Sequence, residues 1–310
     1  MDAATIAFLA DLEPTVEALL ERHLESAKEW FPHEVVPWSR GRDFEEDEQW
    51  DPREVPMDDS LRSALFVNLL TEDNLPYYFA TIDGTFGPDG AWGTWARRWT
   101  AEEGRHSIAI RDYLTVTRAL DPRDLERARM AQVSTGQVPD PDAPRDAIAY
   151  VALQELATRI SHRNTGRLLD DPAGFEVMKR VAGDENRHYL FYRDLVQQAL
   201  EVDPNGMVCA IARQVLDFAM PGTGIIDFTA HARRIADAGI YDFVVHHDQI
   251  LVPVVLTQWR LAEIEGLNGE AEQARAAALH HIERIGKAAR RLEARRERRA
   301  ARSEPVGANA

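Results

Sequence analysis

Apolar residues recur every three or four positions along most of the chain, and no segment alternates apolar and polar residues as a half-buried strand would. This periodicity predicts an all-α fold. A first helix is expected over residues 5–29, interrupted near Pro14, and an irregular acidic stretch should follow to about Met57. Four long helices should form the middle of the chain, at 58–82, 91–119, 145–170 and 173–201.

Helix-capping and turn residues support these boundaries. Asp58 and Ser60 are residues that favour the start of a helix. The Gly- and Pro-rich run at 84–90 predicts a turn, Pro122 can begin a shorter helix, and the run at 134–144 predicts a loop. Shorter helices and a basic helix follow the fourth long helix, so we expect additional helices at both ends of a central bundle.

Each of the four long helices carries a glutamate on its apolar stripe. Glu72, for example, lies one turn after Leu69 and two turns after Leu65, so it should face the core. The inward glutamates are Glu72, Glu103, Glu155 and Glu185. Buried carboxylates without counter-charges cost several kcal/mol each and repel one another. Two divalent metal ions would neutralise all four.

The spacing of these glutamates indicates a duplicated helix pair. Glu72 precedes Glu103 by 31 residues and Glu155 precedes Glu185 by 30. The second glutamate of each pair is followed three positions later by a histidine, His106 or His188. One such Glu-x-x-His signal is weak, but two in this arrangement match the ligand set of ferritin-like four-helix bundles that hold two irons or two manganese ions.

Composition limits the alternatives. A single cysteine, Cys209, excludes an internal disulfide and a cysteine-ligated metal centre. No apolar run is long enough to span a membrane and no basic signal sequence opens the chain, so we expect a cytoplasmic protein without membrane insertion. The net charge of −16 argues against nucleic-acid binding.

The charge is unevenly distributed. Residues 275–302 contain nine Arg and one Lys against three Glu. This run predicts either a solvated basic helix or a docking surface for an acidic partner. We therefore expect a ferritin-like domain over 1–274 and a basic C-terminal helix and tail over 275–310.

The motifs around the candidate ligands resemble those of the soluble acyl-acyl carrier protein (acyl-ACP) desaturases of the stearoyl type, and most closely their actinobacterial members. The similar segments are TEDNLP at 71–76, AWGTWARRWTAEEGRH at 91–106, LQELATRISHRNTGR at 153–167 and DENRH at 184–188, with weaker similarity in EWFPHEVVPW at 29–38. The resemblance implies two iron ions that cycle between Fe²⁺ and Fe³⁺. It implies that Glu103 and Glu185 bridge them, that Glu72 and His106 complete one iron, and that Glu155 and His188 complete the other.

The resemblance also implies roles for residues outside the ligand set. Asp184 would hydrogen-bond a ligating histidine and relay electrons from Trp30, although Trp30 could equally be a packing residue. Thr158 would place its hydroxyl beside the oxygen-binding face, or simply bond its own backbone. His162 is expected to be a satisfied core histidine rather than a ligand. Gly104 departs from the asparagine that is usual in the family.

The implied activity is the insertion of a cis double bond into a saturated acyl chain, with O₂ and two electrons. The implied partners are an acyl carrier protein that bears the substrate, a ferredoxin-type electron donor and a second copy of the chain in a homodimer. Three alternatives stay open: a di-iron oxygenase acting as a hydroxylase or N-oxygenase, an iron-storage or metal-binding protein, and an inactive relative that binds carrier protein or lipid. Chain length, bond position and the native reductant are not predicted.

The duplicated pattern yields one further expectation. Aligning the two halves places Glu102 where Asp184 stands, since each immediately precedes a glutamate that the resemblance makes a bridge. Glu102 should therefore lie against His188, as Asp184 should lie against His106. The alternative is that Glu102 is a solvated acid on the helix surface.

Overall fold

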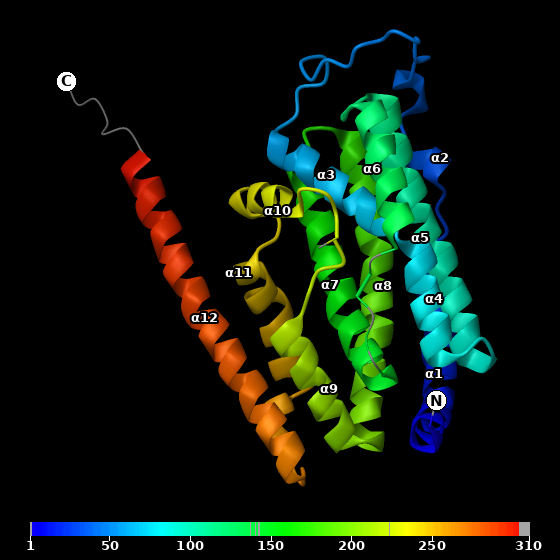
Figure 1. Ribbon diagram of the computed structural model, residues 1–310, viewed down its shortest axis with the longest axis vertical. Coiled ribbons are helices and arrows are strands. Elements are labelled where there is room, and N and C mark those ends of the chain that lie inside the picture. Colours follow the sequence, from blue (N-terminus) through cyan, green and yellow to red (C-terminus); the bar gives the residue numbers. More distant parts are fainter. Residues whose placement is uncertain (1, 137, 140, 142, 223, 304–310) are drawn as a thin grey trace.

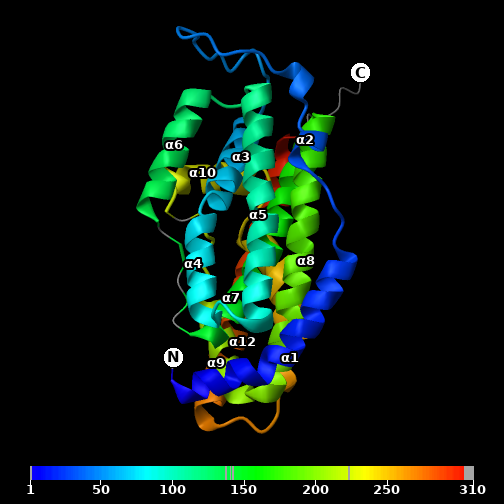
Figure 2. The ribbon, with the colours of Figure 1, turned by 90° about the vertical axis from the view of Figure 1, so that its right-hand side faces the viewer.

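The computed structural model describes residues 2–303 except 137, 140, 142 and 223, and side chains as far as Arg298. Within this part of the chain every regular element is a helix, as Figures 1 and 2 show. The all-α prediction is confirmed. No helix in the described residues is long and apolar enough to cross a membrane.

Four helices form the central bundle. They are α3 (Asp59–Glu72), α5 (Gly90–Thr117), α7 (Pro144–Leu168) and α8 (Pro172–Val202). Helix α4 (Leu75–Phe86) follows α3 after a short break and lies beside α5 (Figure 2). Helices α5 and α7 each contact α8, and α3 contacts both α5 and α7, so the four helices enclose the interior of the bundle. This arrangement confirms the predicted bundle.

The expected helix over 58–82 is two helices in the structure. Helix α3 ends at Glu72 and α4 begins at Leu75, with Pro76 in its first turn. A helix that continued through this point would need a backbone N–H at Pro76 to bond the carbonyl of Glu72, and proline has none. The break leaves Glu72 as the last residue of its helix.

The expected interruption at Pro14 does not occur. Helix α1 runs from Ala3 to Ser26 with Pro14 inside it, and Figure 2 shows the helix changing direction along its length. A proline inside a helix removes one hydrogen bond and bends the axis without necessarily ending it. Burial of Leu12 and Val16 on either side of the proline keeps both parts of the helix against α5 and α8.

The remaining helices cover the bundle at its sides and ends. They are α2 (Pro32–Val35), α6 (Pro122–Thr135), α9 (Pro204–Asp217), α10 (Phe228–Asp237), α11 (Phe243–His246), a π-helix (His247–Gln258) and α12 (Gly269–Ser303), with 3₁₀ turns at Trp38–Arg40 and Leu261–Glu263. The loop expected over 134–144 lies partly outside the described residues.

The predicted basic segment, 275–310, belongs to a longer helix. Helix α12 begins at Gly269, and its first half packs against α9 through Ala271, Ala278 and Ile282 (Figure 1). The last seven residues of the predicted tail, 304–310, lie outside the described residues. The separation of this segment as a domain stays a prediction.

Close packing of α7 on α8 depends on Gly166. A Cβ atom on Gly166 would lie 2.8 Å from Cβ of Met178, whereas one on Gly183 would meet nothing within 4 Å. We expect Gly166→Ala to lower the free energy of unfolding by about 1–3 kcal/mol. The matched change Gly183→Ala should raise it by about 0.5–1 kcal/mol, because alanine is the better helix former. Urea denaturation measures both, and a stabilising Gly166→Ala would show that the two helices do not approach as described.

Candidate metal centre

The six residues predicted from the duplicated pattern meet in the core of the bundle. They come from the four central helices and are at most 7% exposed: Glu72, Glu103, His106, Glu155, Glu185 and His188. Their ligand atoms form two groups in which all atoms lie within 4.8 Å of one another. One group is Glu72, Glu103, His106 and Glu185, and the other is Glu103, Glu155, Glu185 and His188. Glu103 and Glu185 belong to both groups.

The two imidazoles point their Nδ1 atoms toward the carboxylates. His106 Nδ1 lies 3.3 Å from Glu103 Oε2 and 3.6 Å from Glu185 Oε1. His188 Nδ1 lies 2.8 Å from Glu103 Oε1 and 3.5 Å from Glu155 Oε2. Each ring therefore has one nitrogen directed at the cluster and the other directed away from it.

The cluster has the properties of a site for cations. Both Nδ1 atoms, Glu103 Oε1 and Glu155 Oε2 are buried without a well-formed hydrogen bond to any described residue. Each such buried polar atom ordinarily costs about 1–3 kcal/mol, so a set of four that converge on one another indicates ligands for an ion. Carboxylate and imidazole donors suit divalent iron and manganese. The residues thus fit two divalent ions that share Glu103 and Glu185.

The protonation states support the same conclusion. Burial, and then repulsion from Glu185, raise the pKa values of Glu103 and Glu155 above the ordinary carboxyl range. Burial disfavours the charged form of His106 and His188, but the surrounding carboxylates outweigh it and raise both pKa values well above normal. Without metal the cluster therefore holds protons where divalent ions would otherwise supply the positive charge.

Acidic residues hold the outward nitrogen of each histidine. Asp184 Oδ2 lies 3.3 Å from His106 Nε2, and the Trp30 indole donates to the same oxygen at 2.9 Å. On the other half, Glu102 Oε2 lies 2.9 Å from His188 Nε2. The expected contact between Glu102 and His188 is confirmed, and Glu102 is buried rather than solvated. Such partners fix the orientation and tautomer of an imidazole.

Sequence reasoning missed His23 of α1. This histidine is 3% exposed and its Nε2 lies 2.9 Å from Glu102 Oε2. On each half of the centre, the acid that holds the ligand histidine therefore has a further buried partner. Trp30 lies against Asp184, and His23 lies against Glu102. The signal was the position of His23 on the apolar face of its helix, after Leu19 and Leu20, but nothing local to α1 indicates which carboxylate it meets.

Three other polar side chains contact the candidate ligands. His162 is a buried core histidine whose Nε2 lies 2.9 Å from Glu72 Oε1, but its Nδ1 has no hydrogen-bond partner among the described residues, so the expectation of a satisfied histidine holds for one ring nitrogen only. Burial alone would lower the pKa of His162, but Glu185 and Glu72 outweigh this effect and raise the pKa to about 9. Thr158 Oγ1 lies within hydrogen-bonding distance of its own helix backbone and 2.9 Å from Glu185 Oε2. Trp99 Nε1 donates to Glu155 Oε1 at 2.9 Å.

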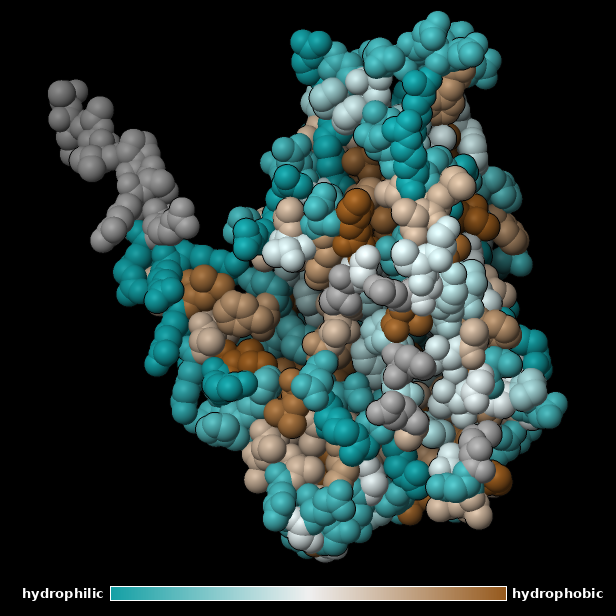
Figure 3. Space-filling model, in the orientation of Figure 1, coloured by the Kyte–Doolittle hydropathy of each residue, from teal (hydrophilic) through white to brown (hydrophobic). Residues whose placement is uncertain are grey.

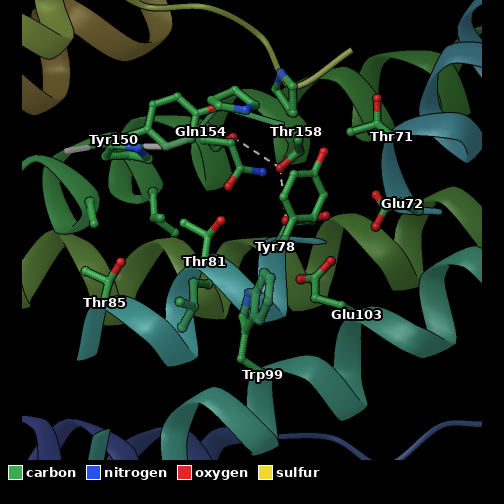
Figure 4. Close-up of a pocket in the computed structure, with 17 residues that line it drawn as sticks. Thr71, Glu72, Tyr78, Thr81, Thr85, Trp99, Glu103, Tyr150, Gln154 and Thr158 are labelled. Atoms are coloured by element: carbon green, nitrogen blue, oxygen red, sulfur yellow. Dashed lines mark hydrogen bonds between the residues drawn. The ribbon is translucent and has the colours of Figure 1, made fainter. Parts of the chain in front are cut away.

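A cavity lies against one side of the cluster. Its wall includes Glu72, Glu103, Glu185 and Thr158, and it extends between α4 and α7 past apolar and hydroxyl side chains. Those side chains include Tyr78, Thr81, Ile82, Thr85, Ala147, Tyr150 and Val151. Figure 4 shows Tyr78 between Thr158 and Glu103, with Thr81 and Thr85 farther along α4. A mainly apolar space thus ends at the candidate metal ligands.

Comparison with known proteins identifies the family. The fatty acid desaturase family model matches residues 4–307. The chain belongs to the fatty acid desaturase family. It is 43% identical over 277 residues to a Mycobacterium tuberculosis protein that carries the provisional name acyl-ACP desaturase DesA1, covering 86% of this chain and 82% of that one. It is 31% identical over 324 residues to the chloroplastic stearoyl-ACP 9-desaturase of Gossypium hirsutum, covering 97% and 79%.

A solved structure supports the same family at the level of the fold. The X-ray structure of the provisionally assigned acyl-ACP desaturase DesA2 of Mycobacterium tuberculosis matches with a TM-score of 0.70 and 29% identity. The match covers 86% of this chain and 99% of that chain. The resemblance inferred from the motifs is confirmed, and as a fatty acid desaturase the chain is an oxidoreductase.

The raised pKa values predict how metal binding depends on pH. Metal ions must displace protons from Glu103, Glu155 and the two histidines, so binding should release protons at neutral pH. Because protons compete for the same atoms, affinity should fall as the pH is lowered. Anaerobic calorimetry with Fe²⁺ in buffers of different ionisation enthalpy measures the release. Metal binding with no net proton release would contradict these protonation states.

Because Glu102 contacts His188 and not His106, replacing Glu102 should weaken only one of the two metal positions. We expect Glu102→Gln to keep the fold and to weaken one of two metal positions by about 10- to 100-fold, the usual effect of losing such a partner. Anaerobic titration with Fe²⁺ should then show one tight and one weak site. The control is Glu17→Gln on the exposed face of α1. Two sites of unchanged affinity in Glu102→Gln would show that this carboxylate does not support His188.

Proposed function

We propose that the protein is an acyl-ACP desaturase that inserts a cis double bond into a saturated fatty acyl chain. The observation that carries this proposal is the mainly apolar cavity whose wall contains Glu72, Glu103 and Glu185. An acyl chain in this space would have one pair of methylene groups beside the candidate ligands. The names of DesA1, DesA2 and the plant stearoyl-ACP 9-desaturases support the same substrate class.

The net reaction sets what the site must supply. One CH₂–CH₂ pair loses two hydrogens and becomes CH=CH, while O₂, two electrons and two further protons complete two molecules of water. Two iron ions held by the six clustered residues would provide the O₂-dependent oxidation. Glu72 and His106 would hold one ion, Glu155 and His188 the other, and Glu103 and Glu185 would bridge them.

The side chains of this protein would position and shield the reaction. The buried wall formed by Ile82, Ala147 and Val151 excludes water and leaves the acyl chain few positions to adopt. Thr158 borders the cavity and contacts Glu185, so its hydroxyl can orient that carboxylate and hold a proton beside the reacting methylenes. Trp99 similarly orients Glu155 through its indole N–H.

Electrons would reach the centre from the opposite side. Trp30 donates to Asp184, which in turn contacts His106, and this series of contacts is supported as an electron route by the family resemblance. We further propose an acyl carrier protein as the substrate carrier, a ferredoxin-type protein as the electron donor and a homodimer as the assembly, in the cytoplasm.

Product analysis tests the function directly. The iron-reconstituted protein is incubated with O₂, a ferredoxin reducing system and a series of saturated acyl carrier proteins of different chain length. We expect a monounsaturated product, two hydrogens lighter than the substrate, in gas chromatography with mass spectrometry. A product that has instead gained one oxygen atom would favour the oxygenase alternative. An iron-loaded protein that desaturates none of the carrier-bound acyl chains, whatever their length, would contradict the proposed function.

A further inference from the structure

The cavity beside the candidate ligands has polar side chains that an unsubstituted acyl chain does not use. Its wall carries the hydroxyls of Tyr78, Thr81 and Thr85 on α4 and the amide of Gln154 on α7. Polar residues are ordinary on a protein surface, and Figure 3 shows hydrophilic residues spread over much of the visible exterior. Inside a cavity, however, such groups need hydrogen-bond partners. We refer to these four side chains as the polar wall.

The Tyr78 hydroxyl is the clearest case. Its oxygen is buried and forms no well-formed hydrogen bond with any described residue. Asn74 lies close to it, but the Asn74 amide nitrogen is itself buried without such a bond. Tyr150 lines the same cavity and differs, because its hydroxyl donates to the backbone carbonyl of Ala219 at 3.2 Å. Of these two cavity tyrosines, Tyr78 therefore has a hydroxyl that can bond a ligand.

The other members of the polar wall are also without partners among the described residues. The hydroxyls of Thr81 and Thr85 bond no described group, whereas Thr94 and Thr100 of α5 each bond the carbonyl four residues earlier. The Gln154 amide likewise bonds no described group, and Figure 4 shows this side chain extending from α7 toward Thr81 of α4. Hydroxyl and amide groups both donate and accept hydrogen bonds, so the wall can bond a neutral polar group.

The polar wall begins beside the candidate metal ligands and runs away from them. Figure 4 shows Tyr78 between Thr158 and Glu103, with Thr81 and Thr85 farther along α4. Successive positions three and four residues apart share one face of a helix, so the three hydroxyls follow one side of the cavity. A group bound to this wall would lie a few carbons away from the methylene pair that reacts, and not at that pair.

We propose that the preferred substrate is an acyl chain that bears a hydroxyl group a few carbons from the pair that is desaturated. This inference rests on the proposed function and names its substrate class. The substituent would accept a hydrogen bond from Tyr78 and donate one to the amide oxygen of Gln154. It takes no part in the oxidation, because both hydrogens leave the CH₂–CH₂ pair and the hydroxyl is retained in the product. An unsubstituted chain would cover the polar wall and leave it without partners, which weakens binding.

A comparison of paired ligands tests this preference without turnover. The probes are acyl carrier proteins loaded with a saturated chain of one length, either unsubstituted or with a hydroxyl group at one of a series of carbons. The Kd of each for the full-length, iron-reconstituted protein is measured by anaerobic calorimetry. The carrier is the same in every probe, so the ratio of two Kd values reports the acyl chain alone. We expect at least one hydroxylated isomer to bind about fivefold or more tightly than the unsubstituted chain.

Three variants assign the preference to the polar wall. Tyr78→Phe and Gln154→Met each remove hydrogen-bonding groups at similar side-chain volume, and each should reduce the Kd ratio to within about twofold of unity. The matched control is Tyr150→Phe, which should keep the ratio of the unmodified protein, because the Tyr150 hydroxyl already bonds Ala219. Thermal unfolding and iron content check that the variants are folded and loaded.

Several results would overturn the proposal. The first is an equal Kd for the unsubstituted chain and every hydroxylated isomer. The second is a preference that survives in both Tyr78→Phe and Gln154→Met, and the third is a preference that Tyr150→Phe abolishes as well. In each case the polar wall would not be what recognises the substituent.

The same probes separate this proposal from the proposed function. Desaturation of the unsubstituted chain together with equal Kd values would overturn the substrate class and leave the function standing. Preferential binding of a hydroxylated chain without desaturation of any chain would contradict the function, while the binding preference would stand. Absence of binding by every acyl chain would contradict both.

Discussion

The structure depends on burying four like-charged carboxylates at one place in an apolar core. Each must lose its hydration. No lysine or arginine among the described residues pairs with them, and their cationic partners there are the imidazoles of His106, His162 and His188. Divalent ions satisfy this constraint. It explains why the central helices share one register: each must bring its glutamate to the same level of the bundle.

The same constraint extends outward through paired contacts. Each histidine turns one nitrogen to the cluster and the other to an acid, Asp184 or Glu102. The halves differ at the next position, where Trp30 bonds Asp184 and His23 bonds Glu102. The duplicated pattern therefore produces two similar sides with chemically different outer partners.

Periodic patterns made the bundle and its candidate ligands predictable from sequence. A glutamate on an apolar stripe must face the core, and two Glu-x-x-His pairs at matching spacing indicate a shared site. The break after Glu72 was not predicted, although Pro76 signals it locally. The partners of His23 and His162 were not predictable, because they depend on how α1 and α3 pack against the other helices rather than on any local pattern.

The central claim is that this carboxylate cluster exists to hold two metal ions. Its most direct test is the iron content of the full-length protein after anaerobic reconstitution and removal of loosely bound metal, combined with Mössbauer spectroscopy of the oxidised sample. Two irons per chain with antiferromagnetic coupling are predicted, because Glu103 and Glu185 lie in both ligand groups. One iron per chain, none, or two uncoupled irons would contradict the claim.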